Sequence, residues 1–134
     1  MHNAVERLIA IRSKIKELLI KNNSKNKDLN IIIVCKTFSM DKILPLIETG
    51  HVHFGESKVQ EAELKWKEVK NKYSNVKLHM VGKLQTNKVK TALKIFDYIH
   101  SVDNYKLAEK IVRKTKVLIL LSFVKLFPWI RYYH

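Results

Sequence analysis

Apolar positions along the chain follow two spacings, one helical and one typical of buried strands. A helical spacing over residues 3–21 predicts a first helix, built on Val5, Leu8, Ile9, Ile15, Leu18 and Leu19. The continuous β-branched run from Ile31 to Cys35 predicts a strand that is covered on both faces. Further short apolar runs begin near residues 51, 77, 97 and 117, and amphipathic helical segments separate them. The pattern is therefore a regular alternation of strand and helix.

Strands that recur every 20 to 26 residues with a helix between them indicate βα units and a parallel sheet. Two architectures fit this pattern: a small open α/β sheet, or part of a (β/α)₈ barrel. A complete barrel typically needs about 250 residues and eight strands. The 134 residues of this chain supply about five strands. In either architecture, ligands bind at the carboxyl ends of the strands.

The second predicted helix runs from a cap at Ser39 to a terminating glycine, Gly50. Pro45 lies inside this segment, so the helix is expected either to start late or to kink there.

The net charge of the chain bears on its possible binding partners. The net charge is +14, which favours nucleic acid or an anionic membrane as a partner. However, 22 of the 26 basic residues are lysines scattered over every segment, which is more typical of solvated helix faces.

A single cysteine, Cys35, excludes a disulfide framework within the chain and favours a reducing cytosol. The beginning of the chain carries charge throughout, unlike a signal peptide, and the apolar run 117–130 is too short to span a bilayer.

Lys36 is the candidate reactive residue, because it ends the buried apolar run at the carboxyl end of the first strand. One interpretation is a solvated or ion-paired lysine at the rim, with Glu56 as its partner. The other is a partly desolvated lysine whose neutral amine forms a Schiff base with an aldehyde. His79 lies in the third strand. It is either a core histidine whose ring nitrogens are hydrogen-bonded within the protein, or a group that hydrogen-bonds a ligand near its ring. The chain contains no P-loop, dinucleotide fingerprint, zinc motif or nucleophile elbow.

Four stretches in order resemble the pyridoxal phosphate homeostasis protein family, which is related to the N-terminal barrel domain of alanine racemase. They are VCKTFS, FGESKVQEAELK, LHMVGKLQTNKVK and FDYIHSVDNYKLAEKI. They match family patterns close to V-S-K-T, F-G-E-N-x-x-Q-E, H-x-I-G-x-L-Q-x-N-K and I-H-S-V-D. The resemblance as a whole covers about residues 1–112.

The resemblance implies an α/β fold: a partial (β/α)₈ TIM-type barrel of about the first four to five βα units, preceded by an N-terminal helix. It implies that pyridoxal 5'-phosphate is held as a covalent Schiff base on Lys36, with weaker roles in cofactor binding for Ser57 and His79. Family members have no established turnover of their own, so a non-catalytic, cytoplasmic binder in cofactor homeostasis is expected. Apo pyridoxal phosphate enzymes are the expected recipients, and no membrane partner is expected.

Four departures from the family qualify these expectations, three at single residues and one at the end of the chain. Cys35 replaces a serine, Ser57 replaces the asparagine of F-G-E-N, and Lys83 stands where a histidine or another polar residue is common. After about Lys114 the resemblance fades, and the later segments that hold the cofactor phosphate in the family are not found. We therefore expect a C-terminally truncated member, with the barrel part at 1–116 and an apolar tail at 117–134 that includes a fifth strand.

Such a half barrel would expose strand edges through which it could self-associate. The alternative functions are a non-functional fragment or a basic nucleic-acid-binding fragment, and we expect no nucleic-acid partner. An active racemase would need a second acid/base group, for which the sequence offers no strong candidate.

Overall fold

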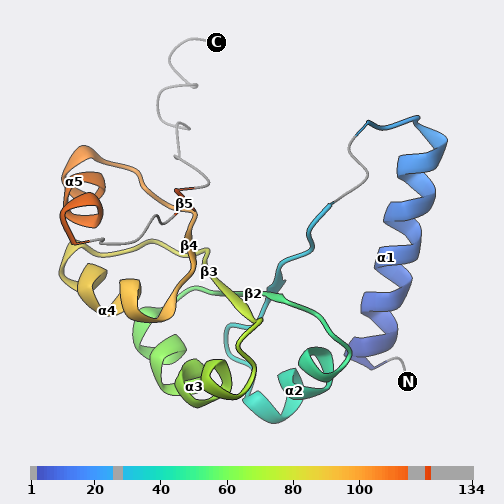
Figure 1. The fold of residues 1–134 in the computed structure, drawn as a ribbon, viewed down its shortest axis with the longest axis horizontal. Helices are drawn as coiled ribbons and strands as arrows, with labels where there is room; N and C mark the ends of the chain where they lie inside the picture. Colours follow the sequence, from blue (N-terminus) through green and yellow to red (C-terminus); the bar gives the residue numbers. More distant parts are fainter. Residues whose placement is uncertain (1–2, 26–28, 115–119, 122–134) are drawn as a thin grey trace.

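The computed structural model describes residues 3–25, 29–114 and 120–121. Helices and strands alternate along this part of the chain (Figure 1), in the order α1 (Ala4–Lys21), β1 (Ile33–Val34), α2 (Met40–Glu48), β2 (His53–Glu56), α3 (Val59–Lys72), β3 (Lys77–Met80), the 3₁₀ turn η1 (Thr86–Lys88), α4 (Val89–Ile95), β4 (Tyr98–Ile99), α5 (Tyr105–Lys114) and β5 (Leu120–Leu121).

The five described strands form one parallel sheet in the order β1-β2-β3-β4-β5. An open doubly wound sheet would have a non-sequential order and helices on both faces. Here each strand pairs with the next one along the chain, and Figure 1 shows α2, α3 and α4 in an arc along one side of the strands. The sheet is therefore part of a (β/α)₈ barrel, as predicted, with its concave inner side uncovered by described residues.

The core lies between the strands and this arc of helices. Trp66 of α3 is completely buried, and its ring packs on Phe54 of β2 at a centroid distance of 5.1 Å. Leu78, Met80 and Ile99 from the next two strands are buried in the same layer. Burying such large side chains supplies most of the stabilisation of a domain of this size.

Helix α2 excludes one of the two alternatives expected for Pro45. The helix begins at Met40, directly after Ser39, and continues through Pro45 to Glu48, so it does not start late. Pro45 removes one backbone hydrogen bond, but the buried Ile43, Leu46 and Ile47 hold the helix against the core.

The ends of α2 were predicted with mixed success. Gly50 follows the helix with φ +91°, which confirms the terminating glycine. Ser39 occupies the N-cap position, but its hydroxyl donates to the Asp41 carboxylate and makes no side-chain cap hydrogen bond to the backbone, so the predicted cap interaction is wrong.

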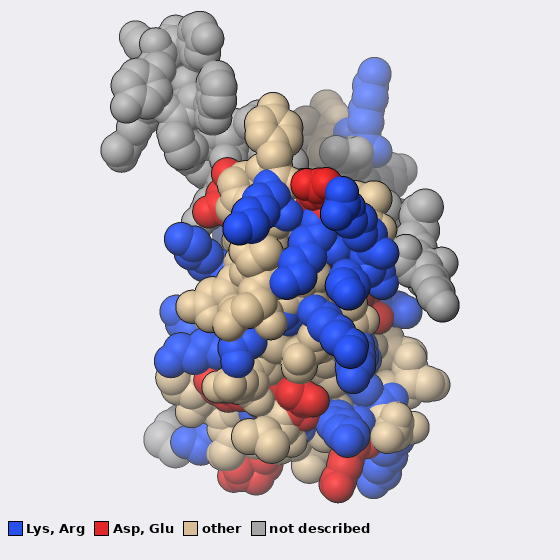
Figure 2. All heavy atoms as spheres, turned by 90° about the vertical axis from the view of Figure 1, so that its left-hand side faces the viewer, with Lys and Arg blue, Asp and Glu red and all other residues tan. Residues whose placement is uncertain are grey.

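The lysine-rich surface lies mainly on the outer helices. The side of the molecule that carries α4 and α5 presents far more Lys and Arg than Asp and Glu (Figure 2). This distribution is the one expected of solvated helix faces. Among the described residues, no helix is long and apolar enough to cross a membrane.

Strand β5 falls within the predicted fifth strand and pairs in parallel with β4, Tyr98 opposite Leu120 and Ile99 opposite Leu121. The rest of the predicted tail, residues 117–119 and 122–134, lies outside the described residues.

Candidate functional site

Lys36 lies in a tight turn at the carboxyl end of β1. The Cys35 amide donates to the Gly55 carbonyl at 2.8 Å, which extends the pairing of β1 with β2 by one residue. The Phe38 amide then donates to the Cys35 carbonyl at 3.1 Å and closes a β-turn with Lys36 and Thr37 at its centre. Lys36 is exposed, and its amine forms no hydrogen bond or ion pair with any residue that the structure describes. The amine is therefore accessible to a ligand.

The strand register relates Lys36 to the two weaker candidates. Val34 of β1 is opposite Gly55 of β2, and Gly55 is opposite His79 of β3. Side chains two residues apart on a strand share a face, so continuing the register places Lys36 and Ser57 at the same level of the inner face, on neighbouring strands. His79 lies one layer deeper and two strands away from Lys36. The structure thus brings Lys36 and Ser57 to one rim and does not bring His79 to it.

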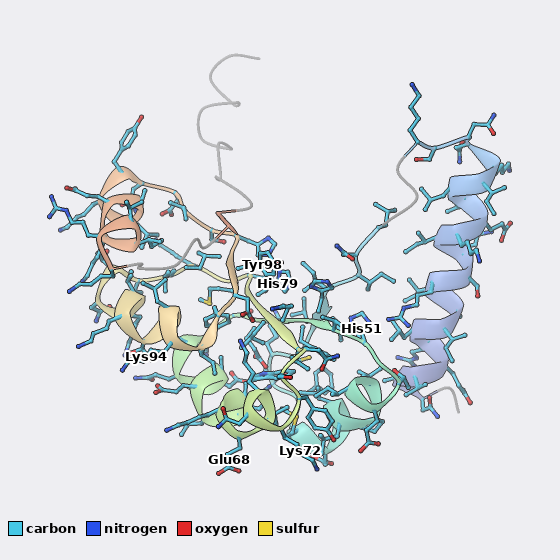
Figure 3. The ribbon with its side chains drawn as sticks, viewed as in Figure 1. His51, Glu68, Lys72, His79, Lys94 and Tyr98 are labelled. Atoms are coloured by element: carbon cyan, nitrogen blue, oxygen red, sulfur yellow. The ribbon has the colours of Figure 1, made fainter. Side chains whose placement is uncertain are left out.

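His79 belongs to a chain of histidines on the inner face. Its two ring nitrogens lie 2.9 Å from His53 Nδ1 and 2.8 Å from His100 Nε2, and its ring stacks on Tyr98 at 4.3 Å. Figure 3 shows His79 and Tyr98 side by side on the side of the sheet away from α3 and α4. Burial first, and then the neighbouring His100 and His53, lower the pKa of His79 to about 4. His79 is therefore neutral at pH 7, and a ligand would have to replace one of its present partners.

The predicted rim pair of Glu56 with Lys36 is wrong. Glu56 is completely buried on the helix side of β2, where its Oε1 lies 2.7 Å from Lys65 Nζ and accepts a hydrogen bond from Trp66 Nε1 at 2.8 Å. The cause is the alternation of side chains along a strand: Ser57 faces inward, so its neighbour Glu56 faces the helices. In the described part of the chain, the other carboxylate oxygen, Oε2, is buried without a hydrogen-bond partner.

Sequence reasoning missed Lys65, which reaches from α3 to the Lys36 turn. Its ammonium group donates to the carbonyls of Cys35 and Phe38 at 2.8 and 2.7 Å. The available signal was its helical position, three residues after the buried Ala62 and next to the buried Trp66, which places it at the edge of the core-facing stripe.

A hollow of about 410 Å³ adjoins the rim between the start of α3 and the loop after β3. Its lining includes Ser57 and three lysines, Lys58, Lys83 and Lys88, but not Lys36. Gly82 sits beside it, where a Cβ atom would come within 2.3 Å of the Ser57 carbonyl oxygen. Only glycine allows these two loops to approach so closely. In residues 3–25, 29–114 and 120–121, no three His, Cys, Asp or Glu side chains are arranged so that they could hold a metal ion.

Two curated relatives of the chain, from different organisms, carry the same name. A pyridoxal phosphate homeostasis protein from Buchnera aphidicola subsp. Schizaphis graminum is 39% identical over 108 residues, which are 81% of this chain and 47% of the relative. The protein of the same name from Escherichia coli K12 is 26% identical over 112 residues, 83% of this chain and 48% of the relative. The chain thus spans about half the length of the curated relatives it matches. No protein-family model matches the chain.

Solved structures agree in fold as well as in sequence. PipY of Synechococcus elongatus, in a structure with PLP bound, has a TM-score of 0.61 and 38% identity, covering 75% of this chain and 47% of PipY. The structure of PipY without PLP gives a TM-score of 0.62 at the same identity. Sequence identity, ordered motifs and barrel topology agree, and the chain belongs to the pyridoxal phosphate homeostasis protein family.

Proposed function

We propose that this chain binds pyridoxal 5'-phosphate through Lys36 and serves in cofactor homeostasis. The observation that carries the proposal is the position of Lys36, an exposed lysine in a fixed turn at the carboxyl end of a barrel strand, where ligands bind in this fold. The relatives named for this function and the solved PipY with PLP bound support the same ligand.

The residues at the rim fit a carbonyl ligand with an anionic group. Lys36 supplies an amine without an internal partner among the described residues, and its unprotonated form adds to an aldehyde carbon with loss of water, which joins the two by a C=N bond. Ser57, half-buried at the same level, offers a hydroxyl to a ligand held there. The lysines of the adjoining hollow make the surroundings positive, which favours a phosphate-bearing ligand over a neutral aldehyde.

The finer expectations stay predictions. They are a non-catalytic role, transfer of the cofactor to apo pyridoxal phosphate enzymes, a cytoplasmic location and self-association through the open strand edges. The last is supported by the position of β1, which ends the described sheet and pairs, among the described strands, only with β2.

The test is to titrate the purified chain with pyridoxal phosphate, reduce with borohydride and map the labelled peptides. We expect an absorption band of a lysine adduct and a label on Lys36. Lys36→Ala should abolish the specific label, whereas Lys67→Ala, which removes another exposed lysine from α3, should leave it unchanged.

Labelling of the Lys36→Ala variant at the level of the parent would remove Lys36 as the site. A label spread evenly over many lysines of the parent chain would show that the positive surface, and not a built site, reacts with the aldehyde.

A further inference from the structure

We infer that Lys65 of α3 is a positioning residue for Lys36, because its ammonium group binds both ends of the turn that carries Lys36. The inference rests on the proposed function, in which the Lys36 amine is the reacting group. Lys65 Nζ donates to the Cys35 carbonyl at 2.8 Å and to the Phe38 carbonyl at 2.7 Å. These are the first and last residues of the β-turn whose central residues are Lys36 and Thr37. One ammonium group therefore fixes the distance between the two ends of the turn.

The turn needs such support because its backbone is strained. Thr37 has φ +69°, in the left-handed region that β-branched residues rarely adopt. Its amide donates to Glu61 Oε1 at 3.0 Å. Glu61 and Lys65 are four residues apart on α3, so one face of the helix supplies an acceptor for the amide and a donor for the two carbonyls. Helix α3 thus stabilises a turn conformation that the β-branched residue Thr37 disfavours.

The Lys65 side chain is itself held in place by a buried carboxylate. Glu56 Oε1 lies 2.7 Å from Lys65 Nζ, and the two side chains are 0% and 10% exposed. Trp66, the next residue on α3, donates its indole N–H to the same oxygen at 2.8 Å. An ion pair this deeply buried persists only when its geometry is good, and removing one partner leaves a costly unpaired charge. The cluster therefore has little freedom to release the turn.

The same contacts assign different roles to the two lysines. The Lys65 ammonium group donates to the carbonyls of Cys35 and Phe38 and forms an ion pair with Glu56 Oε1, all within 2.8 Å. These contacts engage the Lys65 nitrogen, which is therefore not available to attack a carbonyl. Lys36 is exposed and has no such acceptors among the described residues. Lys65 orients the turn, and Lys36 reaches the ligand.

The test compares Lys65→Met with the double variant Lys65→Met/Glu56→Gln, which removes the cation without stranding a buried carboxylate. Lys70→Met is the matched control, since Lys70 makes the same kind of contacts from the same helix, to the Ile95 carbonyl at 2.8 Å and to Asp97 at 2.6 Å, but far from Lys36 along the sheet. Two quantities are measured below the melting temperature of each variant: amide hydrogen exchange at residues 36–38, and the apparent affinity for pyridoxal phosphate from the Lys36 label.

We expect the double variant to speed exchange at Thr37 and Phe38 and to weaken the apparent affinity about tenfold or more, the equivalent of one lost charge-assisted hydrogen bond. Lys70→Met should leave both quantities as in the parent chain. Unchanged exchange and affinity in the double variant would overturn the inference, and so would equal losses in Lys70→Met. If the parent chain forms no Lys36 label, the proposed function fails, and hydrogen exchange alone then decides whether Lys65 holds the turn.

Discussion

Cys35, the residue before Lys36, turns its thiol away from the inner face and into the core. Its side chain is 2% exposed, and its Sγ donates to the Ile33 carbonyl at 3.3 Å. Burial, followed by the nearby Glu56 carboxylate, raises the pKa of the thiol from 9.0 to about 12, with Lys65 acting in the opposite direction. Cys35 is therefore a small core residue beside the site and not a second nucleophile in it.

This environment predicts the reactivity of the thiol. A pKa of about 12 in place of 9.0 leaves roughly a thousandfold less thiolate at pH 8. We expect a disulfide reagent to modify the folded chain at least a hundredfold more slowly than the urea-unfolded chain, as followed by absorbance. The unfolded chain is the internal control, and a folded rate within tenfold of it would contradict the buried placement of Cys35.

Lys36 and Lys65 mark what sequence reasoning can and cannot supply about single residues. The position of Lys36 at the carboxyl end of a strand was predictable, because it interrupts an apolar run there. Lys65 was not, because it lies in a helix with several lysines and its role comes from two carbonyl groups some 30 residues earlier. Every residue has a backbone carbonyl that can accept a hydrogen bond, so the side-chain pattern of a sequence does not predict which carbonyl a lysine will bind.

At the level of elements, Gly82 allows the loops after β2 and β3 to pack closely against each other. An added Cβ would lie 2.3 Å from the Ser57 carbonyl oxygen and 2.8 Å from its Cα, both of them backbone atoms that cannot rotate away. We expect Gly82→Ala to lower the free energy of unfolding by about 1–3 kcal/mol, measured by urea denaturation. The neighbouring Lys83→Ala, at an exposed position, should change it by less than about 0.5 kcal/mol. Equal stability of the two variants would show that the loops separate freely.

Strand and helix positions were largely predictable, but side-chain directions were not. The alternation of apolar runs fixed the order of the βα units, and the strands begin close to the expected residues. The misassigned Glu56 shows the reason for the difference. A strand covered on both faces has no polar side to reveal its phase, so a shift of one residue exchanges the inner and outer faces. Only packing partners such as Trp66 decide which way Glu56 points.

Across the whole described sheet, three histidines meet although they come from three separate strands or strand ends. His53, His79 and His100 are separated by 26 and 21 residues, close to the repeat of the βα units. The register pairs His53 with Lys77 and His79 with Tyr98, so each histidine lies two residues further along its strand than the previous one, on the same face. The spacing is visible in the sequence, but only the register shows that the rings meet. A partial barrel was predictable from the period of the strands, whereas this chain of rings on its inner face was not.

The histidine chain makes the stability of the whole fold sensitive to acid. Burial lowers the pKa of His53, His79 and His100, that of His79 from 6.5 to about 4, although Asp97 nearby acts in the opposite direction. A lowered pKa favours the neutral form in the folded state, so its stabilisation is complete above about pH 6.5 and is lost as the pH falls toward 4.

We expect the free energy of unfolding to fall by about 2 kcal/mol between pH 7 and pH 4.5, less than the full shift implies because solvent screens the open inner face. Urea denaturation at several pH values measures this slope. His79→Phe, which keeps a ring to stack on Tyr98 but cannot titrate, should be less stable at pH 7, because His53 and His100 lose their shared partner. It should also show a shallower dependence on pH. A variant slope as steep as that of the parent chain would assign the acid sensitivity to groups other than this histidine chain.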